Sequence, residues 1–326
     1  MKAYIYVLVA TFLFSSMETV LKYIGMQVNA LDLVFYRFLI AGLILLPMAV
    51  RTLKKRIAFK DIRKKDWLFF ASMGFICVVI SMVSVQLALE LIPASNVALI
   101  ICCIPAFTVV FARLFLKEQI YLLAVLTIAL CIVGIVFIIN PSHTSLPPAG
   151  VFMALISAIT FSIYTVLSRR KADQYSMVSV CCFCFLFGSL EMLLLIAAGH
   201  IPVLADFYIL AGLTQFANVN LLSGITLKNL PVLLYAGVGI TGLGYMLFFQ
   251  AMIEKTAAFA SISFLIKPVL ATLFSVWLLH ETVNGSMIIG IILILLGSSI
   301  LLWSNIRLEK GKRLKTLGKP YSDFST

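Results

Sequence analysis

Long apolar stretches separated by short polar segments dominate this sequence. Ten of them are long enough for a membrane-crossing helix, which needs about 20 residues to span about 30 Å. They lie at 3–24, 30–50, 67–90, 94–116, 120–139, 149–168, 177–198, 230–252, 257–279 and 285–304. The alternating pattern of a membrane barrel is absent, so the backbone must satisfy its hydrogen bonds within helices. The pattern therefore predicts an all-α integral membrane protein with ten transmembrane helices.

Two segments need a separate interpretation. The segment 207–224 is apolar but interrupted by Gln215, Asn218 and Asn220, so we expect an interfacial or loop helix there. The N-terminal stretch continues past Glu18 without a small-residue cleavage site. We therefore interpret it as the first span and not as a removed signal peptide.

The composition excludes most soluble enzymes. Hydrophobic residues make up 62% of the 326 positions and charged residues 12%, whereas about a quarter of a soluble domain is charged. The seven cysteines form neither a disulfide framework nor a CxxC metal pair, and His143, His200 and His280 are scattered. There is no Walker phosphate loop. We expect no metal, no cofactor and no enzymatic activity.

The positive charges follow the predicted membrane topology. With the N-terminus inside, the inner segments hold 21 of the 25 Lys and Arg residues, including eight at 51–65 and six in the C-terminal tail. The positive-inside rule then places both termini in the cytoplasm of a cell (inner or plasma) membrane protein. The net charge of +12 is thereby explained without a nucleic-acid partner. A lipid-headgroup patch at 51–65 is the alternative interpretation.

The chain also repeats itself at an offset of 163 residues. Identical pairs at this offset include Gly74 and Gly237, Ala88 and Ala251, Pro105 and Pro268, Phe111 and Phe274, Leu116 and Leu279, Glu118 and Glu281, and Gly134 and Gly297. Near the start of each copy the offset is 146, and it pairs Ser16, Thr19, Val20 and Leu21 with Ser162, Thr165, Val166 and Leu167. Each copy contains five predicted helices. Because five is odd, the copies must cross the membrane in opposite senses, which gives a 5+5 inverted-topology repeat.

Such a duplication is typical of secondary transporters. Two pseudo-equivalent halves can move against each other and expose a midplane site to either face in turn. A channel, a receptor or a membrane enzyme does not need this symmetry.

Several motifs together resemble the EamA-type family of the drug/metabolite transporter superfamily. They are a first span reaching Lys22, a second span opening on Tyr36-Arg37-Phe38, and two Pro-to-Glu segments, PAFTVVFARLFLKE and PVLATLFSVWLLHE, at 105–118 and 268–281. The tryptophan often found in the family's first span is absent here, with Phe14 nearby.

The resemblance covers about residues 3–305 and carries expectations of its own. It implies one five-helix unit at 1–140, a second at 149–305 and a basic cytoplasmic tail at 306–326. It also implies a central cavity between the halves and the movement of small organic metabolites.

Charged residues inside the spans are the natural site candidates, because each costs about 2.5–3.5 kcal/mol at a helix centre. Glu18 and Lys22 are four residues apart on one helix face and can pair, and Arg37 can compete for the same carboxylate. One interpretation is an ion pair that locks the first two spans. The other makes Glu18 a proton-coupling group. Lys22 can also be an interface lysine that reaches toward the headgroups.

Lys267 lies near the middle of the ninth span, directly before Pro268. We expect it to face the cavity and meet an anionic group of the substrate, or to pair with Glu18 or Glu191. Pro105 and Pro268 are candidates for helix kinks or hinges.

Neutral polar side chains in the spans complete the candidates. Tyr164 aligns with Glu18 in the repeat, and Gln250 lies in the eighth span. Both are candidate substrate contacts, although such groups often serve helix packing. Glu118 and Glu281 lie at helix ends, where we expect them to support the fold.

The sequence thus predicts a secondary transporter that exports a small polar metabolite, such as an amino acid or another carboxylate, by alternating access. The alternatives are efflux of lipophilic cationic drugs with Glu18 as the key anion, and a membrane enzyme that acts on lipid-linked substrates through residues 199–228. The expected partners are the metabolite and the lipid bilayer. A proton as coupling ion and a homodimer are hypotheses that the sequence leaves open.

Overall fold

The computed structural model describes residues 2–56, 61–117, 122–139, 146–210, 213–221, 225–254 and 262–316. In these residues every regular element is a helix. Seven helices there are long and apolar enough to cross a membrane, and three shorter apolar helices accompany them. The structure therefore confirms the predicted all-α fold of ten apolar helices.

The first half of the bundle supplies five spans, several of them interrupted. Its elements are α1 (Lys2–Ser15), α2 (Met17–Gly25), α3 (Ala30–Lys54), α4 (Lys64–Gly74), η2 (Phe75–Met82), α5 (Val83–Leu91), α6 (Ala94–Ile101), α7 (Ile104–Leu116) and α8 (Leu122–Ile139). The first span breaks at Ser16, and the fourth breaks at Cys102 and Cys103, two residues before Pro105. Because proline lacks an amide hydrogen, it fits the first turn of α7.

The second half supplies the other five spans and a short segment between the seventh and eighth spans. Its elements are α9 (Pro148–Tyr175), α10 (Met177–Ala198), α11 (Pro202–Leu210), η3 (Thr214–Phe216), α12 (Leu230–Leu234), η4 (Tyr235–Leu243), α13 (Gly244–Glu254), α15 (Ile262–Leu279) and α16 (Gly285–Thr316). Pro268 lies inside the continuous helix α15, whereas Pro105 lies in the first turn of α7. α16 continues to Thr316, into the segment that we assigned to the tail.

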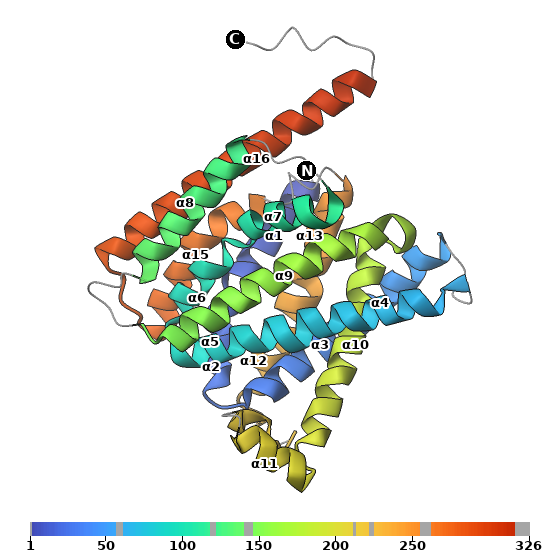
Figure 1. Ribbon diagram of the computed structural model, residues 1–326, viewed down its shortest axis with the longest axis vertical. Coiled ribbons are helices and arrows are strands. Elements are labelled where there is room, and N and C mark those ends of the chain that lie inside the picture. The colour runs from blue at the N-terminus through green and yellow to red at the C-terminus, as the bar shows by residue number, and fades with distance from the viewer. Residues whose placement is uncertain are drawn as a thin grey trace.

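The two halves pack in a pseudo-symmetric way. α3 of the first half lies against α10 of the second, and α8 lies beside α16 at one edge of the bundle (Figure 1). These pairs join the second span to the seventh and the fifth to the tenth. Likewise α1 packs on α13 and α15, while α9 packs on η2, α5 and α7. The first span thus packs on the eighth and ninth spans, and the sixth span packs on the third and fourth. These are the same neighbours with the two halves exchanged.

Two π-helical segments lie at corresponding places in the halves. η2 covers residues 75–82, and an offset of 163 residues moves it to 238–245, which overlaps η4 at 235–243. A π-helical turn contains an extra residue and is often found at functional sites. The repeat is thus present in the local backbone as well as in the sequence.

Glycines allow the close approach of helices in the core. A Cβ atom built on Gly74 would lie 2.6 Å from the carbonyl oxygen of Cys184 and 2.7 Å from the amide nitrogen of Gly188. Between α8 and α16, a Cβ on Gly290 would lie 2.8 Å from the carbonyl oxygen of Gly134. Small residues at such crossings increase van der Waals contact, which drives helix association in lipid.

The connection after α10 differs from the expectation. The segment 207–224 is not a single helix, because α11 begins earlier, at Pro202, and the short helix η3 follows at Thr214–Phe216. In α11 the apolar side chains of Val203, Phe207 and Leu210 are exposed. Glu118 and His143 lie outside the described residues.

Candidate functional site

A buried ion pair joins the two halves near the middle of the bundle. The Lys267 Nζ atom on α15 donates a hydrogen bond of 2.7 Å to Glu18 Oε1 on α2. Both side chains are buried, with exposed fractions of 3% and 0%. The second oxygen, Glu18 Oε2, has no hydrogen-bond partner among the described residues. A buried pair of this kind is stable only while both partners remain charged and paired.

Lys22 does not take part in this pair, contrary to the pairing that its spacing predicts. Its Nζ atom instead donates a 2.6 Å hydrogen bond to the carbonyl oxygen of Ile92 and lies 4.0 Å from Glu281 Oε1. The physical reason is that Lys22 is partly exposed and reaches the end of the bundle, whereas Glu18 faces Lys267 in the interior.

Arg37 on α3 is a second buried cation. Its side chain is 1% exposed, and its guanidinium carbon lies 4.7 Å from the centre of the Phe38 ring. The Nε and Nη1 atoms have no hydrogen-bond partner within the described parts of the chain. Glu18, Tyr245 and Cys77 are close enough to interact with Arg37 electrostatically. Arg37 therefore does not form a hydrogen bond with the Glu18 carboxylate but is close enough to be stabilised by its negative charge.

Aromatic rings pack beside Arg37, which together with Glu18 and Lys267 forms the charged centre of the bundle. The Tyr245 ring on α13 makes edge contacts with Phe14 at 5.2 Å and with Phe185 at 5.4 Å between ring centres. Phe185 in turn contacts Phe38 at 4.9 Å. Such rings provide apolar surface and can also stabilise a cation over their faces.

The neutral candidates from the sequence make packing contacts. The Tyr164 hydroxyl lies 3.1 Å from Cys181 Sγ, and Gln250 Nε2 lies 3.6 Å from Met48 Sδ. In the repeat Tyr164 corresponds to Glu18, and it is also buried. Glu191 Oε2 lacks a partner among the described residues, and it does not pair with Lys267.

Sequence reasoning missed Asp32, in the first turn of α3. Its side chain is fully buried, and within the described chain neither carboxylate oxygen has a hydrogen-bond partner. A helix N-terminus favours a negative charge, which partly offsets this burial. The signal that could have found it is an acidic residue just inside the predicted second span.

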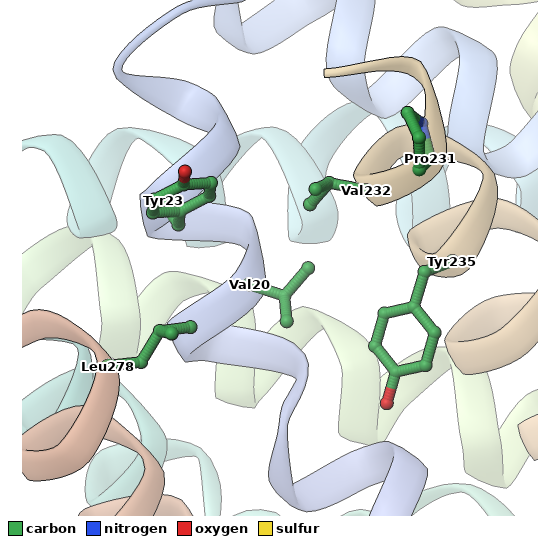
Figure 2. Close-up of a pocket in the computed structure, with 6 residues that line it drawn as sticks. All are labelled: Val20, Tyr23, Pro231, Val232, Tyr235 and Leu278. Atoms are coloured by element: carbon green, nitrogen blue, oxygen red, sulfur yellow. The ribbon is translucent and has the colours of Figure 1, made fainter. Parts of the chain in front are cut away.

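A pocket of about 380 Å³ opens near one end of the bundle, between the first span and the eighth and ninth spans. Figure 2 shows its lining: Val20, Tyr23, Pro231, Val232, Tyr235 and Leu278. At the side of this pocket the Tyr235 hydroxyl lies 2.9 Å from Ser16 Oγ, at the break between α1 and α2. Glu18 is only two residues further along but does not line the pocket. The charged centre is therefore occluded in this conformation.

The described residues contain no group of three or more His, Cys, Asp or Glu side chains that could hold a metal ion. Their seven cysteines are buried free thiols. The arrangement offers charge, hydrogen-bond donors and aromatic surface inside a helical bundle. It is suited to binding a small charged molecule.

A model of the EamA-like transporter family matches residues 1–140 and 148–303, which is nearly the whole chain. This chain belongs to the EamA-like transporter family. It is therefore a membrane transporter and not an enzyme.

Relatives of this EamA-like transporter are also named as transporters. An uncharacterized transporter of Clostridium kluyveri is 33% identical over 96% of this chain and 97% of its own length. An S-adenosylmethionine uptake transporter of Rickettsia bellii is 25% identical over 75% of this chain and 80% of its own length. A solved crystal structure aligns with a TM-score of 0.58 at 18% identity, over 91% of this chain and 96% of its own, which supports the fold alone.

Proposed function

We propose that this EamA-like transporter exports a small carboxylate-bearing metabolite, such as an amino acid or an amino-acid derivative, by alternating access. The observation that carries this proposal is the buried guanidinium of Arg37, whose Nε and Nη1 atoms have no partner in the described chain. A planar guanidinium binds a carboxylate through two parallel hydrogen bonds. An incoming carboxylate would supply the acceptors that the protein does not.

The balance of charge supports an anionic group on the cargo. Arg37 and Lys267 are buried cations, and Glu18 is the carboxylate that pairs with one of them. Glu18 Oε2 remains available to accept a hydrogen bond from an ammonium group. A zwitterion would thus satisfy Arg37 with its carboxylate and Glu18 with its amine, and both groups would be desolvated at low net cost.

The aromatic rings suit the remainder of such a molecule. Phe14, Tyr245 and Phe185 lie around the charged centre and would accept an apolar or cationic side chain. S-Adenosylmethionine combines a carboxylate, an ammonium and a sulfonium ion, and relatives from Rickettsia are named as its uptake transporters. It is therefore the first cargo to test, together with simpler amino acids.

We place both termini in the cytoplasm, because the predicted inner segments hold most of the basic residues. Export would then begin with cargo entering from the end of the bundle where Lys2 lies. Release would follow at the opposite end, next to the pocket at Val20 and Leu278. Proton exchange at Glu18 is the coupling step that we propose, since Oε2 of this carboxylate would be free to take up a proton once the ammonium group of the cargo has left it.

Counterflow in proteoliposomes tests the chemical class of the cargo. Vesicles are loaded with an unlabelled compound and offered a trace of the same labelled compound. We expect accumulation of S-adenosylmethionine or of an amino acid, and none of the corresponding decarboxylated amine. Accumulation of a lipophilic cation without a carboxylate would contradict the proposal and favour drug efflux through Glu18.

The direction of transport needs a separate measurement in cells. Strains that overproduce the protein should release more of the cargo into the medium than strains that lack it. A lower extracellular level in the overproducing strain would instead indicate uptake.

A further inference from the structure

A cluster of polar contacts around Glu281 ties the two halves together at one end of the bundle. Glu281 follows α15, and its carboxylate accepts hydrogen bonds from the backbone amides of Ala94 at 2.6 Å and Ser95 at 3.0 Å. The Ser95 hydroxyl donates a third hydrogen bond of 2.5 Å. Lys22 adds a positive charge 4.0 Å away. One carboxylate of the second half thus holds the start of α6 and the end of α2, both in the first half.

A second cluster, around Asp66, joins the halves at the opposite end. Asp66 in α4 accepts a 2.8 Å hydrogen bond from the Tyr175 hydroxyl and another from Lys171 Nζ, both on α9. The continuous helical segment Lys64–Leu91 separates the two ends, since Asp66 lies at its beginning and Ala94 just beyond its end. At each end of the bundle one acidic residue therefore joins the two halves.

Three layers of contacts follow one another from Glu281 to the charged centre. The first is the Glu281 cluster itself. The second is the hydrogen bond of 3.0 Å between Thr19 Oγ1 on α2 and Ser275 Oγ on α15. The third is the Glu18–Lys267 pair. All three join the first span to the ninth, so this end is fully open only when all three have separated.

We propose that Glu281 is a gating residue of the transport cycle: its carboxylate closes this end of the bundle and releases α6 and Lys22 when the end opens. The Glu281 and Lys22 side chains are 11% and 25% exposed, so water can replace their contacts. The Glu18–Lys267 pair has no such access. The outer layer therefore separates first. This inference concerns the cycle and holds whichever metabolite is carried.

The accessibility of a thiol behind the gate tests this proposal. Ser275 is fully buried between Glu281 and Lys267, so a Ser275→Cys variant in nanodiscs should react slowly with a membrane-impermeant maleimide. Adding Glu281→Gln should raise the reaction rate about tenfold or more, as expected for the loss of charge-assisted hydrogen bonds. The same protein without the added cysteine gives the background of the seven native thiols.

Matched variants separate gating from damage to the fold. Glu254→Gln makes the same chemical change at an exposed position and should leave the labelling rate unchanged. Ser95→Ala removes a single hydrogen bond of the gate and should raise the rate less than Glu281→Gln does, in protein that elutes as a single gel-filtration peak. An unchanged rate in both folded gate variants would overturn the proposal, as would an equal rise in Glu254→Gln. Neither result depends on the cargo, so the proposed function is tested separately.

Discussion

At the scale of single residues, the central feature is a salt bridge that exists only because two distant segments meet. Glu18 and Lys267 are separated by 249 positions in the chain, yet their hydrogen bond measures 2.7 Å. Either charge alone would be costly in this interior, because desolvation is not offset without the partner. The pair therefore stabilises the contact between the halves and also holds two charges ready for a ligand.

Replacing Lys267 with methionine should strongly destabilise the protein. The change leaves the Glu18 carboxylate buried without its partner, which typically costs about 3–5 kcal/mol. We expect a clearly lower melting temperature, measured on purified protein in detergent, and loss of transport. The double variant Glu18→Gln/Lys267→Met should recover most of the stability but not the transport. Lys228→Met, at an exposed position, is the control and should change neither property.

At the scale of the helices, close crossings and interruptions determine the shape of the bundle. Gly74 and Gly188 bring α4 and α10 into contact across the halves, and the π-helical segment η2 begins directly after Gly74. η4 repeats this arrangement after α12. Both interruptions lie in the third and eighth spans, which flank the charged centre. We interpret them as places where these spans can bend during transport.

A methyl group at Gly74 should disturb this crossing. The added Cβ would lie within 2.7 Å of backbone atoms of α10, which cannot move independently of the helix. We expect Gly74→Ala to cost about 1–3 kcal/mol through overpacking, with a lower melting temperature and less monodisperse protein. Gly285→Ala is the matched control, since a Cβ there would have no neighbour within 4 Å. Equal melting temperatures for the two variants would contradict the tight packing at Gly74.

At the scale of the whole molecule, the spans and the duplication could be predicted because both follow from local apolar runs and recurring residues. The pairing of charges could be predicted only as one of several alternatives. Helix spacing allowed Glu18 to pair with Lys22, and for Lys267 a cargo anion, Glu18 and Glu191 all stayed open. The structure selects the pair of Glu18 with Lys267, on a helix of the other half. Asp32 was overlooked because its burial depends on helices packed around it, which no local pattern records. The break at Cys102 and Cys103 likewise lies inside an uninterrupted apolar run.

The orientation in the membrane remains a prediction that cysteine labelling can check. Single cysteines that replace Lys2 and Lys228, in a background without native cysteines, should differ in their labelling in intact cells. An impermeant maleimide should label the Lys228→Cys variant and leave Lys2→Cys unlabelled, because the basic residues favour a cytoplasmic N-terminus. The reverse pattern would invert the proposed topology and with it the direction of export.

The most direct test of the account is transport by Arg37→Met in proteoliposomes, compared with wild type and with Arg51→Met at an exposed position. We expect the carboxylate of the cargo to bind Arg37, whose Nε and Nη1 atoms form no hydrogen bond within the described chain. Arg37→Met should therefore remain folded and as thermostable as wild type, yet lose at least tenfold in apparent affinity for the cargo, about 1.4 kcal/mol. Wild-type affinity in folded Arg37→Met protein would contradict it.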